Sequence, residues 1–195
     1  MKKISKKKSI SVVYCGDGSV EEGVFYESIN FAATKKIPVL FVCENNSYSV
    51  YSPLSVRQPE GRKIHEMVKG MGVDSAYEDG NDIRKVYRLT KRAISKIYET
   101  GNPFFMELQT YRWREHCGPN YDNNIGYRSE EEFLEWKKRD PIKLFEKKLL
   151  KEKICTKGEI RRINKEVLGQ IKEAFNFAKS SPFPDPSEAF ESMFA

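Results

Sequence analysis

Two short, mostly apolar runs, each ending in a polar turn, constrain the fold of this chain most strongly. Residues 9–15 lead into Gly-Asp-Gly at 16–18, and residues 39–43 lead into Glu-Asn-Asn at 44–46. Apolar, β-branched runs bounded by turn residues are typical of buried strands. Between them, residues 20–34 carry apolar side chains at near-helical spacing. A strand, a helix and a second strand predict a parallel sheet, and open parallel sheets bind ligands at the carboxyl ends of their strands, where both turns fall.

The spacing of the two turns predicts a site for a magnesium diphosphate group. Asn46 follows Asp17 by 29 positions. Magnesium takes octahedral oxygen ligands and usually only one or two carboxylates, so one Asp, one Asn amide and a backbone carbonyl suit it. Gly16 and Gly18 let the backbone turn sharply and approach a phosphate, and oriented N–H groups in a turn bind anions. In the alternative interpretation, Asp17 caps a helix and the asparagines are ordinary turn residues; the joint pattern favours the metal site.

After the second turn the chain alternates between helical and strand patterns and then becomes helical. The expected elements are a helix at 62–71, a strand at 73–77, a helix at 83–100, a strand at 104–108, and helices at 129–138, from 140 onward and at 158–179. We therefore predict an α/β fold, with a parallel sheet flanked by helices. The α/β region spans residues 1–128, and a helical C-terminal region, residues 129–195, packs on the same domain.

A long polar and aromatic loop after the strand at 104–108 is the second candidate for function. It runs from Thr110 to Tyr127 and follows the carboxyl end of a strand, which suits a functional loop better than a simple connection. Arg112 and Arg114 offer paired donors for phosphate or carboxylate. His116 is one of only two histidines and is well placed for proton transfer or a phosphate hydrogen bond. The other, His65, is interpreted as structural.

Composition narrows the function classes. The 195 residues are 39% hydrophobic and 32% charged, and no apolar run approaches the roughly 18 residues of a membrane helix. The net charge of +6 is explained by a lysine-rich start and mixed helix faces, and there is no nucleic-acid-binding module. The four cysteines have neither metal-ligand spacing nor a disulfide pattern. We expect a cytoplasmic protein that binds neither nucleic acid nor membrane.

The two turns and the residues between them resemble the thiamine diphosphate motif. The matching positions are Gly16-Asp17-Gly18-Ser19, Glu22-Gly23, Glu27, Asn30, Ala32, Pro38, Glu44-Asn45-Asn46 and Tyr48. More narrowly, the chain resembles the alpha subunit of the first component of 2-oxo acid dehydrogenase complexes of the pyruvate, branched-chain and acetoin type. The resemblance implies thiamine diphosphate and Mg²⁺ as cofactors. It implies that Asp17, Asn46 and the Tyr48 carbonyl bind the metal, and that the N–H groups of Gly18 and Ser19 bind the diphosphate.

The same resemblance assigns roles in the loop. Arg112 matches the family's arginine, which reaches the diphosphate, and His116 matches the second histidine of the usual His-Gly-His, a catalytic and cofactor-binding position. Arg114 and Glu115 depart from that pattern. Cys117 stands where mitochondrial relatives carry a phosphorylatable serine, so phosphorylation there is not expected.

The resemblance also implies an oxidoreductase that decarboxylates a small 2-oxo acid and passes the acyl group to a lipoyl carrier. Its partners would be a beta subunit, which carries the activating glutamate in a heterotetramer, and a lipoyl acyltransferase. The family's alpha subunit has further sequence before this strand, so we expect an incomplete domain that needs the missing N-terminal half of the alpha subunit and is inactive without partner chains. The alternatives are a transketolase- or decarboxylase-like thiamine enzyme, or an inactive fragment that acts only as an interaction module.

Overall fold

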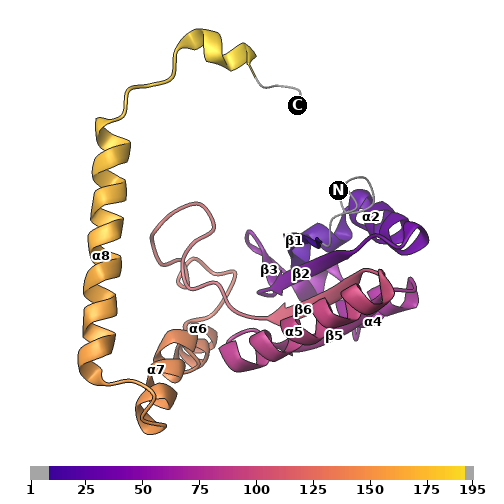
Figure 1. The fold of residues 1–195 in the computed structure, drawn as a ribbon, viewed down its shortest axis with the longest axis horizontal. Helices are drawn as coiled ribbons and strands as arrows, with labels where there is room; N and C mark the ends of the chain where they lie inside the picture. The colour runs from indigo at the N-terminus through magenta and orange to yellow at the C-terminus, as the bar shows by residue number, and fades with distance from the viewer. Residues whose placement is uncertain (1–8, 192–195) are drawn as a thin grey trace. The chain divides into compact units, whose positions relative to one another are not determined.

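The computed structural model describes residues 9–191, and its centre is a four-stranded sheet (Figure 1). The strand order is β1-β2-β6-β5, and every neighbouring pair is parallel. The strands are β1 (Ser11–Gly16), β2 (Val39–Asn45), β5 (Asp74–Asp79) and β6 (Phe104–Gln109). The predicted α/β fold is therefore confirmed, and the four expected strands all form within two residues of the expected bounds.

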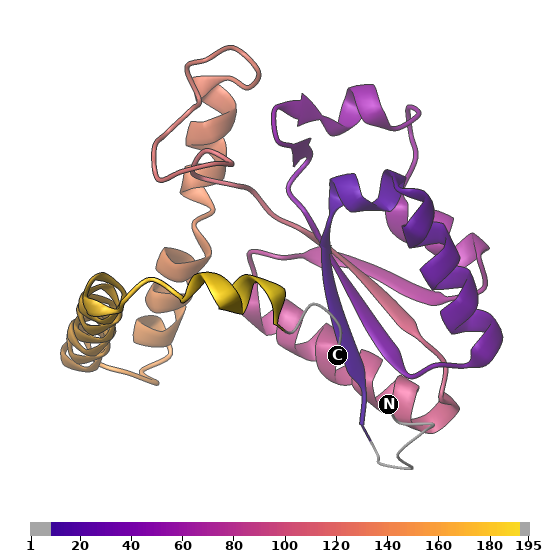
Figure 2. The same ribbon diagram turned by 90° about the horizontal axis from the view of Figure 1, so that it is seen from above.

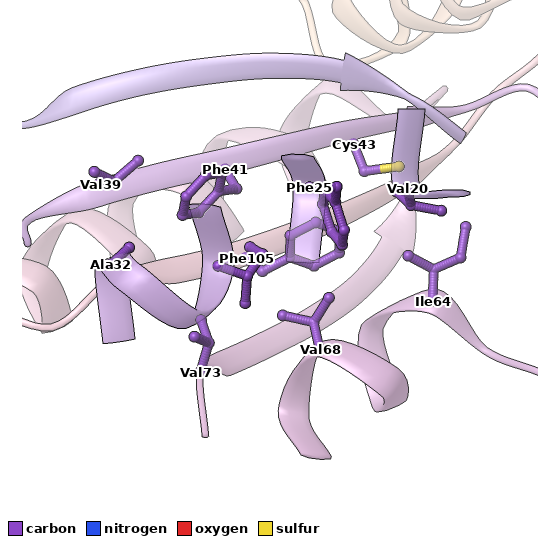
Figure 3. Packing of buried hydrophobic residues seen from close by; sticks show 11 residues of the cluster. Val20, Phe25, Ala32, Val39, Phe41, Cys43, Ile64, Val68, Val73 and Phe105 are labelled. Atoms are coloured by element: carbon purple, nitrogen blue, oxygen red, sulfur yellow. The ribbon is translucent and has the colours of Figure 1, made fainter. Parts of the chain in front are cut away.

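Helices cover both faces of the sheet because the central strands are apolar on both sides. On one face, α2 (Gly23–Lys35) and α4 (Ile64–Gly70) enclose Phe41, Cys43 and Phe105 (Figure 3). On the other face of the sheet lies α5 (Ile83–Thr100) (Figure 2). It packs against the alternate residues of β2 and β6. Burial of this kind contributes roughly 25 cal/mol per Å² of apolar surface, which is the main term that holds such layers together.

Helix ends follow the signals in the sequence. The Asp82 carboxylate accepts hydrogen bonds from the N–H groups of Arg84 and Lys85, and so caps α5. The helix ends at Gly101, whose φ of 74° lies in the left-handed region that glycine adopts without steric cost. Cap residues and glycine stops are local interactions, which explains why the bounds of α5 could be predicted from the sequence.

Two features near the first turn differ from the prediction. The chain forms a 3-10 helix, η1 (Asp17–Glu21), before α2 begins at Gly23, whereas the periodicity placed the helix start at Val20. After β2, a small hairpin of β3 (Tyr48–Ser49) and β4 (Ser52–Pro53) leads into α3 (Leu54–Arg57). Strands of two residues are too short to give an alternating pattern, so the sequence could not predict them.

Strand β1 lies at an edge of the sheet, and its side chains are much less covered than those of β2. Val12, Val13 and Tyr14 are exposed, with Tyr14 at 69%. In β2, by contrast, six of the seven residues are buried. Apolar side chains on an edge strand are unusual, because edges normally carry polar or charged residues that discourage further pairing.

The C-terminal region is helical, as predicted. It contains α6 (Glu130–Lys138), α7 (Pro141–Lys151), α8 (Lys157–Ser180) and η2 (Pro186–Phe190). Ser129 caps α6, and Thr156 with Glu159 forms a capping box at α8. The chain divides into one compact unit up to Phe145 and a second from Glu146. The predicted boundary after residue 128 stays a prediction. Within residues 9–191, no helix is both long and apolar enough to cross a membrane.

Candidate functional site

A pocket of about 440 Å³ lies beyond the carboxyl ends of β1 and β2. Three segments line it: residues 16–22, residues 46–50, and the loop between β6 and α6. All the residues predicted for the site line this pocket: Asp17, Gly18, Ser19, Asn46, Tyr48, Arg112 and His116. The structure thus brings together residues that are almost 100 positions apart in the sequence. Their individual roles stay predictions.

Asp17 is held by two neighbours in the pocket wall. Its side chain is 1% exposed, its Oδ1 accepts a hydrogen bond from the Asn46 N–H at 3.3 Å, and its Oδ2 forms an ion pair with Arg57. Burying a carboxylate is costly unless it is paired and hydrogen-bonded, and these two contacts offset that cost. The Asn46 amide oxygen in turn accepts the Tyr48 N–H at 3.0 Å, which closes the turn after β2.

Gly18 matters for a close approach rather than for an unusual backbone angle. A Cβ at this position would lie 2.5 Å from Ser49 Oγ and 2.8 Å from Ser49 Cβ. A Cβ at Gly16 would meet nothing within 4 Å. Neither glycine has a positive φ, so a sharp turn does not explain the glycine at either position. Only Gly18 requires the absence of a side chain, because η1 packs directly on the β3–β4 hairpin.

The oxygen donors in the pocket suit a hard cation such as Mg²⁺. One carboxylate (Asp17), one amide oxygen (Asn46) and one backbone carbonyl (Tyr48) come from adjacent strand ends. The Asn46 oxygen accepts one hydrogen bond and retains a second lone pair. Among the described residues, no cluster of three or more His, Cys, Asp or Glu side chains could hold a metal. The donor set therefore fits an ion that also takes phosphate and water ligands.

Arg112 connects the long loop to the hairpin. It donates to the Val50 carbonyl at 2.8 Å and to the Tyr127 hydroxyl at 3.0 Å, and its Nη1 lies 3.4 Å from His116 Nδ1. An arginine can only donate, so in this contact Nδ1 of His116 is the acceptor. Arg112 and His116 therefore lie side by side in one wall of the pocket.

A buried ion pair that the sequence analysis missed holds the loop in place. The Arg128 side chain is 0% exposed, forms an ion pair with Asp122, and donates to the Arg112 carbonyl at 2.6 Å. The Tyr127 hydroxyl donates to the other oxygen of Asp122 at 2.7 Å. Burial alone would raise the pKa of Asp122, but the hydrogen bonds from Tyr127 and Arg128 outweigh it and lower that pKa. Only the alternation of acidic, aromatic and basic residues in this loop hinted at such a network.

Tyr48 links the pocket to α6. Its hydroxyl donates to Glu132 Oε2 at 2.6 Å, and its ring packs edge-to-face against Tyr127 at 5.4 Å. Burial, followed by the hydrogen bond to Glu132, raises the pKa of Tyr48 well above its usual value. The side chain of Tyr48 is thus committed to packing, and the backbone carbonyl is the group left for a metal.

His65 and Arg114 do not line the pocket. The N–H and Nδ1 of His65 contact Glu107 Oε2 at 2.9 and 2.7 Å, and Asn45 Nδ2 donates to Glu107 Oε1 at 2.8 Å. His65 therefore joins α4 to β6, in agreement with its structural interpretation. Arg114 donates to the Pro119 carbonyl and lies over the Tyr121 ring, so it stabilises its own loop instead of facing the pocket.

Comparison with known proteins identifies relatives over nearly the whole chain. The family model described as dehydrogenase E1 component matches residues 1–187. The chain is similar to the pyruvate dehydrogenase E1 component subunit alpha of Rickettsia felis, with 31% identity over 192 residues, which is 98% of this chain and 58% of the relative. The subunit of the same name from Staphylococcus aureus (strain Mu50) is 33% identical over 179 residues, 90% of this chain and 48% of the relative.

A plant relative gives the same result. The chloroplastic pyruvate dehydrogenase E1 component subunit alpha-3 of Arabidopsis thaliana is 31% identical over 186 residues, which is 95% of this chain and 42% of the relative. The chain thus spans 42% to 58% of the length of these three relatives.

Proposed function

The chain belongs to the dehydrogenase E1 component family, and on this basis we propose that it forms the cofactor-anchoring part of an alpha subunit of a 2-oxo acid dehydrogenase. The observation that carries the proposal is the convergence of Asp17, Asn46, Arg112 and His116 on one pocket. The relatives are named pyruvate dehydrogenase subunits, which supports an oxidoreductase that acts on the oxo group of a small 2-oxo acid. The acyl group would pass to a lipoyl carrier.

The pocket residues divide between a metal and a diphosphate. Asp17, the Asn46 amide and the Tyr48 carbonyl would bind Mg²⁺, because all three present hard oxygen donors to the same space. The N–H groups of Gly18 and Ser19 would bind the diphosphate, since both lie in the turn of η1 that lines the pocket. Arg112 would add a positive charge from the opposite loop.

Thiamine diphosphate, the cofactor that the family implies, supplies an electron sink for decarboxylation when it is bound. His116 would then hold its proton on Nε2, directed by Arg112 at Nδ1, and could donate it to a phosphate oxygen or to an oxygen of the substrate. The buried Asp122–Arg128 pair would keep the loop closed over this wall and limit the access of water.

Partner chains would complete the active site. A beta subunit, in a heterotetramer, would bring the glutamate that activates the cofactor, and a lipoyl acyltransferase would receive the product. The exposed apolar side chains of β1 support a further covering segment, the remaining part of the alpha subunit. We propose the cytoplasm as the location, because all four cysteines are free thiols, as a reducing compartment favours.

Titration calorimetry tests the anchoring role. The chain is titrated with thiamine diphosphate and Mg²⁺, alone and co-expressed with a beta subunit and the remaining alpha segment. We expect saturable binding in the assembled form and its loss in Asp17→Ala. Asp74→Ala is the matched control, because Asp74 forms a surface pair with Lys96 and lies at the amino end of β5. Binding that is absent in every combination, or equal in wild type and Asp17→Ala, would contradict the proposal.

A further inference from the structure

Arg57 holds Asp17 from outside the pocket. Its guanidinium pairs with Asp17 Oδ2, its Nη1 lies 2.5 Å from Glu21 Oε1, and its Nε donates to the Ser52 carbonyl at 3.1 Å. The Arg57 side chain is only 10% exposed. It does not line the pocket, whereas Asp17 does. Three of its donors are thus held by acceptors on two segments, Asp17 and Glu21 in η1 and Ser52 in β4.

The two oxygens of Asp17 therefore have different environments. Oδ2 is paired with Arg57, while Oδ1 accepts, within residues 9–191, only the 3.3 Å hydrogen bond from the Asn46 N–H. A carboxylate oxygen has room for a further partner beyond one hydrogen bond. Because the guanidinium is planar and fixed at three points, it also sets the rotation of the carboxylate.

We propose that Arg57 is a positioning residue, which orients the Asp17 carboxylate so that Oδ1 can bind the metal. The inference rests on the proposed function, in which Asp17 is a metal ligand. Partners behind a ligand commonly fix its orientation, and their loss typically lowers metal affinity by about 10- to 100-fold. Neither the resemblance nor the sequence pattern pointed to Arg57, because it lies on α3, a four-residue helix that the sequence did not predict.

Glu21 completes this arrangement by balancing the charge of Arg57. A lone guanidinium against Asp17 would cancel the negative charge that attracts a divalent cation. Glu21 Oε1 forms an ion pair with Nη1 of Arg57 and also accepts a hydrogen bond from Gln58 Nε2 at 3.0 Å. The Arg57–Glu21 pair is neutral as a unit, so Asp17 keeps a net negative charge toward the pocket.

The opposite interpretation is that Arg57 competes with the metal for Asp17. The two interpretations predict opposite signs. If Arg57 positions Asp17, its removal weakens metal binding. If Arg57 occupies the place of the metal, its removal strengthens metal binding, as expected for the loss of a competing cation.

Mn²⁺ binding, followed by electron paramagnetic resonance in the presence of thiamine diphosphate, decides between them. The full chain is assembled with the same partner chains in every sample. We expect Mn²⁺ to bind about 10- to 100-fold more weakly in Arg57→Gln, with a changed zero-field splitting of the bound ion. Unchanged or tighter binding would overturn the inference. Arg92→Gln, an exposed arginine on α5, is the matched control and should bind like wild type.

Glu21→Gln keeps the inference testable even if Arg57→Gln does not fold. This variant leaves the contact between Arg57 and Asp17 in place but removes its charge balance, so Mn²⁺ should again bind more weakly. In the double variant the loss should equal that of Arg57→Gln alone, because Glu21 acts through Arg57. Additive losses, or normal binding in Glu21→Gln, would contradict the charge balance. A wild-type assembly that binds no Mn²⁺ would instead overturn the proposed function itself.

Discussion

At the scale of single residues, Gly18 is a position where an added side chain would clash with a neighbouring element. We predict that Gly18→Ala destabilises the chain by roughly 1 to 3 kcal/mol, because its Cβ would clash with Ser49 and push η1 away from the hairpin. Gly16→Ala is the matched control, since a Cβ there meets nothing within 4 Å. Urea unfolding of the three proteins measures the difference. Equal stability of the two variants would contradict the close approach.

Asp122 gives the loop a dependence on pH. Its pKa is lower in the folded chain than the ordinary value of 3.8, so the unfolded chain takes up the proton first. The stabilisation by Asp122 is therefore complete above pH 3.8 and is lost as the pH falls through the folded pKa. Asp122→Asn should lower the free energy of unfolding by roughly 2 kcal/mol at pH 7, and should make that free energy less dependent on pH in the acid range. Urea unfolding of wild type and Asp122→Asn between pH 7 and pH 2.5 tests this. The same loss of stability with acid in both proteins would contradict it.

The residues of the site differ in whether a short stretch of sequence is enough to predict them. Asp17, Asn46, Arg112 and His116 could be predicted to line one site, because each lies within seven residues after the end of a strand and belongs to a short motif. Arg57 could not, because its role depends on a contact with Asp17 across 40 positions. The Asp122–Arg128 pair is separated by only six positions, but nothing in a loop sequence indicates which charges are buried.

At the scale of elements, the neighbouring strands β1 and β2 bring two thiols together. Cys15 and Cys43 are paired in register, and a hydrogen bond between them, with burial, raises the pKa of Cys43 far above its usual range. Cys117 is exposed in the long loop. We predict that iodoacetamide at pH 8 modifies Cys117 first and Cys43 only after unfolding, because the thiolate is the reacting form. Peptide mass spectrometry with Cys117→Ser as control tests this order; early modification of Cys43 would contradict it.

Helices and strands in which apolar residues recur at a regular spacing were predicted well, and elements of only a few residues were not. The 18 residues of α5 show a strong apolar stripe with an Asp cap and a Gly stop, so both ends could be placed. The β3–β4 hairpin and α3 span only a few residues, and their geometry is set by contacts with η1. The helix start at Val20 was wrong because the acidic residues after Gly18 suit a 3-10 turn as well as an α-helix.

At the scale of the whole molecule, β1 is the part that a partner should change most. Its apolar side chains are exposed, and the chain spans only 58% of its Rickettsia felis relative. We predict that assembly with the remaining alpha segment and the beta subunit slows hydrogen exchange at the amides of residues 11–16 more than at those of 104–109. The latter already lie in the centre of the sheet. Equal slowing of both strands, measured by mass spectrometry, would contradict a covering segment at β1.

The contact of Asn45 with Glu107 has a consequence for how sequences of this kind can vary in length. It ties one residue of β2 to one residue of β6, and β1 follows β2 in strict register from Ser11 to Gly16. Because successive side chains of a strand alternate between faces, a single-residue insertion in β2 would turn its buried residues to the wrong side and separate Asn46 from Asp17. Length changes should therefore be tolerated at the amino ends of these strands, and excluded from the stretch between Val39 and Asn46.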